Sequence, residues 1–97
     1  MDRLAMPVCS GEQATNNISA DAVVKAGVGR LVRISVVTAG SAAGAAHDCA
    51  AIGDAAAGNK VATIPNTAGT IMLLDWPCGL GIVLKPGSGQ VLAVTWA

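Results

Sequence analysis

The pattern of apolar and polar positions divides the chain into short segments that glycine, proline and asparagine separate. The clearest is Arg30 to Thr38, in which Val32, Ile34 and Val36 alternate with polar residues. Side chains of a strand point alternately to its two faces. The alternation therefore predicts a strand rich in β-branched residues, with Val32, Ile34 and Val36 on its buried face.

Further strands are predicted wherever a short apolar run ends at turn-forming residues or at the last residues of the chain. These strands are Ala20 to Lys25, Ala45 to Ile52, Lys60 to Ile64, Thr70 to Trp76, Gly81 to Lys85 and Gln90 to Trp96. Short strands at roughly 8–12-residue spacing are typical of sandwiches and barrels. The pattern predicts an all-β, antiparallel β-sandwich of about seven strands.

The alanine-rich stretch from Ser41 to Gly58 is ambiguous. Alanine is the best helix former, but alanine lies on every side of this stretch, three glycines interrupt it, and no 3.6-residue period emerges. We therefore expect the strand Ala45 to Ile52, followed by a turn over Gly53 to Asn59. A short helix at Ala55 to Ala57 is the alternative within that turn.

The chain is long enough for one domain, and its first residues follow no period. Met1 to Asn17 contains Pro7, Gly11 and a pair of asparagines. We expect residues 1–17 to form an N-terminal arm and residues 18–97 to form the sandwich domain. Such an arm could become ordered on binding and clamp a neighbouring subunit.

Composition excludes several classes of protein. Hydrophobic residues make up 53% of the 97 residues and charged residues 12%, with six acidic and six basic side chains. This balance argues against a disordered chain and against a nucleic-acid partner. The sequence holds no apolar run of about 20 residues and no secretory leader, so no membrane partner is expected. Few charges and no net charge favour association, so we expect a homo-oligomer.

Residue types that carry chemistry cluster only at His47, Asp48 and Cys49. On a strand, His47 and Cys49 would share a face and Asp48 would point away, so Asp48 could not orient the imidazole as in a catalytic triad. The spacing of His47, Cys49, Cys78 and Cys9 fits no zinc motif. We expect no catalytic residue, no cofactor and no metal, and we interpret the cysteines as small buried side chains in a reducing compartment.

Two further features bear on binding. The glycine pair that precedes Arg30 and Arg33 is explained better by a turn than by a phosphate loop. Trp76 and Trp96 are the only aromatic residues, and each is either a core anchor or a plug between subunits. The candidate interface residues are Trp76, Trp96, Arg30, Arg33, Met6 and Val8.

Val24 to Val36 contains a turn of the form K-x-G-x-G-x-L that leads into the expected strand Arg30 to Thr38. This segment resembles a turn and central strand of small accessory virion proteins of tailed bacteriophages. Asp54 to Pro65 resembles the second hairpin of those proteins. Gly79 to Leu84, followed by Val91 to Trp96, resembles their closing strand pair. The resemblance covers Ala20 to Ala97, and it departs at His47, where many such proteins are expected to have tyrosine near this position.

The resemblance implies a compact β-sandwich, in some relatives a jelly roll, that assembles as a trimer or another oligomer. It implies a non-enzymatic capsid decoration or cement protein, made in the host cytoplasm and located on the capsid surface of the virion. Its partners would be copies of itself and the major capsid protein. The alternatives are a tail, adaptor, head-fibre or spike protein, a small glycan-binding β-domain, and an enzyme, against which the single histidine argues.

Overall fold

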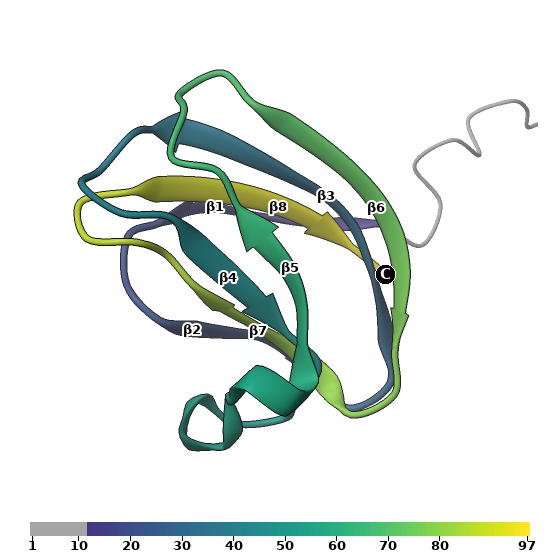
Figure 1. The fold of residues 1–97 in the computed structure, drawn as a ribbon. Helices are drawn as coiled ribbons and strands as arrows, with labels where there is room; N and C mark the ends of the chain where they lie inside the picture. The colour runs from purple at the N-terminus through teal and green to yellow at the C-terminus, as the bar shows by residue number, and fades with distance from the viewer. Residues whose placement is uncertain (1–11) are drawn as a thin grey trace, which may run out of the picture.

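The computed structural model describes residues 12–97, which form two four-stranded antiparallel sheets packed face to face (Figure 1). The strands are β1 (Gln13–Ile18), β2 (Ala22–Ala26), β3 (Gly29–Thr38), β4 (Gly44–His47), β5 (Lys60–Ile64), β6 (Ile71–Cys78), β7 (Gly81–Lys85) and β8 (Val91–Trp96). The predicted all-β sandwich is confirmed, with eight strands instead of about seven. No helix among the described residues is long and apolar enough to span a membrane.

The order of the strands is that of a jelly roll. One sheet has the order β1-β8-β3-β6 and the other the order β2-β7-β4-β5. Strands pair from the two ends of the chain inward: β1 with β8, β2 with β7, β3 with β6, and β4 with β5. The chain thus forms one long hairpin that folds over so that β8 also pairs with β3, and β7 with β4. This arrangement is the double-sheet jelly roll.

The core lies between the sheets and is built from aliphatic side chains of both. Its members are Ile18, Leu31, Ile34, Val36, Ala46, Ile64, Cys78, Ile82, Leu84, Leu92 and Val94. The prediction that Val32 lies on the buried face of β3 was wrong, because Val32 is only half-buried and Leu31 is fully buried in its place. Val32 is an extra residue against β8, where Leu31 pairs with Trp96 and Arg33 with Thr95. Such a β-bulge reverses the alternation of faces.

The sandwich begins earlier than predicted. Strand β1 spans Gln13–Ile18, whereas we expected an arm as far as Asn17. This strand lies at the edge of its sheet, and most of its side chains are exposed on both faces, so its sequence shows no apolar alternation. Its backbone pairing with β8 holds it in place. Residues 13–17 of the expected arm therefore belong to the sandwich, and residues 1–11 lie outside the described part.

The predicted strand Ala45 to Ile52 was wrong in its second half. Strand β4 ends at His47, and the chain then enters a loop that contains two short 3₁₀ turns, η2 (Ile52–Asp54) and η3 (Ala57–Asn59). Strands β4 and β5 pair as the predicted hairpin across this loop. Alanine occurs on both sides of the boundary, so its side chains carried no signal for the end of the strand.

Strand β7 is buried on both faces. Ile82, Val83 and Leu84 are all fully buried. Val83 pairs across the sheet with His47, which is itself buried and hydrogen-bonded to the β4–β5 loop. The single chain therefore covers both faces of this strand.

Candidate functional site

His47 holds the β4–β5 loop in place. Its Nδ1 atom lies 2.9 Å from Asn59 Oδ1 and 3.1 Å from the Ala56 carbonyl oxygen. The Asn59 amide donates from Nδ2 to the Asp54 carbonyl oxygen, which fixes Oδ1 as the atom that faces the imidazole. Because both partners of Nδ1 are acceptors, Nδ1 carries the proton and donates. His47 is only 6% exposed. Its Nδ1 atom is occupied by a structural hydrogen bond.

Asp48 fixes the turn between β6 and β7. Its carboxylate accepts hydrogen bonds from the backbone N–H groups of Gly79 at 3.0 Å, Leu80 at 2.8 Å and Gly81 at 3.3 Å. These donors favour the charged carboxylate and lower the pKa of Asp48, and the N–H group of Leu80 has the largest effect. Burial raises the pKa, but by less than the Leu80 hydrogen bond lowers it. As predicted, Asp48 does not orient His47.

Cys49 and Cys78 are free thiols buried in the sandwich. Cys49 and Cys78 are each 2% exposed. Burial raises the pKa of Cys49, and it raises the pKa of Cys78 to about 11, so both stay protonated at neutral pH. Within residues 12–97, no three His, Cys, Asp or Glu side chains are grouped so that they could hold a metal ion. Cys9 lies outside the described residues.

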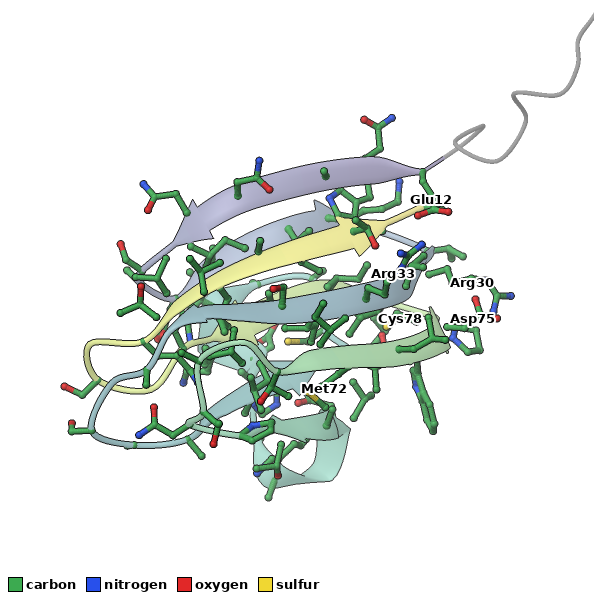
Figure 2. The ribbon with its side chains drawn as sticks, turned by 90° about the horizontal axis from the view of Figure 1, so that it is seen from above. Glu12, Arg30, Arg33, Met72, Asp75 and Cys78 are labelled. Atoms are coloured by element: carbon green, nitrogen blue, oxygen red, sulfur yellow. The ribbon has the colours of Figure 1, made fainter. Side chains whose placement is uncertain are left out.

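Arg30 and Arg33 are ion-paired within the chain (Figure 2). Arg30 Nη1 lies 3.2 Å from Asp75 Oδ1 and 3.1 Å from the Asp75 carbonyl oxygen. Arg33 Nη2 lies 3.8 Å from Glu12 Oε1. Both arginine side chains are about half exposed. Each charge is therefore partly balanced by an acidic side chain of the same chain.

Trp96 is a core anchor. It packs against the core, its Nε1 donates to Thr15 Oγ1 at 3.1 Å, and Lys25 Nζ lies 5.5 Å from the ring centroid. These contacts favour the first of the two interpretations that the sequence left open for Trp96. Trp76 differs, because 47% of it is exposed on the edge strand β6.

Two turns at one end of the sandwich present large apolar side chains to solvent. Val28, in the β2–β3 turn, is 76% exposed, and Leu80, in the β6–β7 turn, is 63% exposed. The Gly27 N–H donates to the Leu80 carbonyl oxygen at 2.9 Å, so the turns are bonded to each other. Asp48 fixes the second turn. We call Val28 and Leu80 the turn patch. Trp76 precedes this turn on β6.

A shallow apolar groove of about 200 Å³ lies on the outer face of the β1-β8-β3-β6 sheet. Its lining residues are Asn16, Arg33, Ser35, Ile71, Ala93, Val94 and Thr95. Ile71, Ser35 and Ala93 lie directly opposite one another on β6, β3 and β8. Ile71 is 67% exposed and forms the wall beside a floor of small side chains. We call this feature the sheet groove.

Sequence reasoning found some of these surfaces and missed others. It named Trp76 and Arg33, which lie on the exposed surface, and it did not single out Val28, Leu80 or Ile71. For Val28 and Leu80, the missed signal was an apolar residue at a turn position, where polar residues are usual. A second, flatter hollow beside β5 is lined by residues from Ala57 to Thr63, and neither hollow contains tryptophan, as a glycan site would need.

Met6 and Val8 lie outside the described residues. Comparisons with models of protein families, with curated proteins and with solved structures each find no match.

Proposed function

We propose that the chain is a non-enzymatic structural protein of a tailed-bacteriophage virion. In this proposal it decorates the capsid as a homo-oligomer and stabilises the shell by adding contact area. The observation that carries the proposal is the turn patch. Val28 and Leu80 are exposed, large and apolar, and hydrogen bonds hold the turns that carry them. Apolar side chains that are exposed side by side on ordered turns are the kind of surface that a partner protein buries on binding.

Three other features support this role. The jelly roll is a common architecture of viral structural domains, although a fold alone does not determine function. The only cluster of catalytic residue types is occupied by structural hydrogen bonds. The segments that resemble accessory virion proteins include both turns of the patch, Gly27-Val28 and Gly79-Leu80.

The proposal predicts that binding to capsids depends on the turn patch. Replacing both residues in the variant Val28→Ser/Leu80→Ser should raise the dissociation constant for accessory-protein-free capsids about thirtyfold, which corresponds to about 2 kcal/mol. Both side chains are solvent-exposed, so the fold should tolerate the change. Binding is measured by co-sedimentation with purified capsids of the phage that encodes the protein.

The matched control is Leu73→Ser, because Leu73 is 75% exposed on β6 away from both turns. It should bind like the unchanged protein. Sedimentation equilibrium of the free protein tests the oligomer and should give a mass that is a multiple of 9.5 kDa. A protein that stays monomeric at high concentration and ignores capsids would refute the proposal.

A further inference from the structure

The sheet groove has the shape and chemistry of a site for an extended apolar segment. Ile71 borders the groove on one side and Asn16 borders it on the other, and the small side chains of Ser35 and Ala93 lie between them. The two floor residues belong to neighbouring strands and face the same side of the sheet. Side chains of valine, leucine or methionine would fill such a trough and bury its apolar surface.

The chain itself has a segment of this kind, and the described part of the chain begins beside the groove. Residues 1–11 precede Glu12, whose carboxylate is paired with Arg33, and Arg33 lines the groove. Figure 2 shows Glu12 and Arg33 facing each other at this end of the sheet. The segment carries Leu4, Met6 and Val8 at every second position. In an extended chain these three side chains point to the same side.

We propose that residues 1–11 of the same chain lie in the sheet groove, with Met6 over Ser35 and Ala93. The reach is sufficient, because the six Cα–Cα steps from Met6 to Glu12 span up to about 20 Å. Neighbouring strands are about 4.8 Å apart, so the whole width from β1 to β6 is about 15 Å. Gly11 is the residue type that tolerates the reversal needed to turn back over the sheet.

The covalent link between residues 1–11 and Glu12 favours the chain's own segment over that of a second copy. A segment joined by a short linker acts at an effective concentration in the millimolar range. A neighbouring copy at micromolar concentration cannot compete with it. The inference does not depend on the capsid role, because the turn patch and the sheet groove share no residue.

Disulfide trapping tests the inference. The variant Met6→Cys/Ser35→Cys, made in a Cys9→Ser background, should form an intrachain disulfide under mild oxidation at low micromolar concentration. The matched control is Met6→Cys/Thr63→Cys in the same background, because Thr63 is exposed on β5 in the other sheet. The first pair should close at least about tenfold faster than the control. The buried Cys49 and Cys78 should not react. Intact mass and a non-reducing gel measure the product.

Methyl NMR of the full chain gives a second measurement that needs no new disulfide. Met6→Asp should shift the methyl resonances of Ile71 and Ala93 and leave that of the core residue Ile64 unchanged, whereas Met6→Leu should shift none of them appreciably. Predominantly interchain disulfides would overturn the proposal and assign the groove to a second copy. Equal closure rates in the two cysteine pairs, together with unchanged Ile71 and Ala93 resonances in Met6→Asp, would show that residues 1–11 do not occupy it.

Discussion

Asp48 shows how a residue type that suggested catalysis acts structurally. Its carboxylate accepts three backbone N–H groups of the β6–β7 turn, the same turn that presents Leu80. One side chain therefore couples the end of β4 to the proposed contact surface. Its neighbours His47 and Cys49 act locally, one through Asn59 and the other through the Ala51 carbonyl oxygen.

The lowered pKa of Asp48 predicts a stability that depends on pH. A carboxyl group with a lowered pKa in the folded state stabilises the fold above its unfolded value of about 3.8, and this contribution is lost as the pH falls through the folded value. We expect Asp48→Asn to lower the free energy of unfolding by about 1–2 kcal/mol at pH 7 and by clearly less at pH 3. Urea denaturation at both pH values measures the difference.

Asp54→Asn is the matched control for this experiment, because Asp54 is an exposed acidic residue of the following loop. Its effect should be within about 0.5 kcal/mol at pH 7. If Asp48→Asn lost the same free energy at both pH values, the charge of Asp48 would not be what holds the turn.

At the scale of elements, two loops at the other end of the sandwich pack against each other without room for a side chain. A Cβ atom on Gly40, in the β3–β4 loop, would overlap the Ser88 carbonyl oxygen in the β7–β8 loop. Asn66 pairs with both backbone groups of Gly40, at 2.6 and 2.7 Å, as a neighbouring strand would. Three connections thus meet at this glycine.

This packing predicts that Gly40→Ala destabilises the fold by at least about 2 kcal/mol, since overpacking forces the backbone to shift. Gly53→Ala in the β4–β5 loop is the control, because nothing lies within 4 Å of a Cβ added there. It should change the free energy of unfolding by less than about 0.5 kcal/mol. Thermal and urea denaturation measure both variants. Equal effects would show that the loops can separate at little cost.

The sequence predicted those strands whose ends are marked by turn residues. Strands β3, β5, β6, β7 and β8 lie within about two residues of their predicted bounds, because glycine or proline follows nearly every one of them. Strand β1 was missed because an edge strand exposed on both faces needs no apolar alternation. The end of β4 was missed because it depends on a contact between Asp48 and a turn more than thirty residues later.

The surfaces were harder to predict than the strands. Arg30 and Arg33 look like free charges in the sequence, and only the pairing of β3 with β6 and the position of Glu12 supply their partners. The turn patch depends on two turns that are adjacent only in the folded jelly roll. Long-range pairing of this kind leaves no local pattern.

At the scale of the whole molecule, the chain has few charged side chains, and several of these form ion pairs with one another. Lys85 Nζ lies 3.9 Å from Asp21 Oδ2, a further ion pair within residues 12–97 beside those of Arg30 and Arg33. The chain has six acidic and six basic residues and no net charge. Such a molecule produces little long-range field, so electrostatic attraction should contribute little to the proposed contact with the capsid.

Binding to capsids should therefore depend weakly on salt. Between about 0.05 and 0.5 M NaCl the dissociation constant should change by less than about threefold, because screening acts on exposed charges and the turn patch has none. Ammonium sulfate should tighten binding, since excluded salts strengthen apolar contacts. Co-sedimentation across both salt series measures this. A dissociation constant that rises more than tenfold over the NaCl series would mean that the Arg30 and Arg33 pairs open to bind the capsid, and the contact surface would then have to be reassigned from the turn patch to β3.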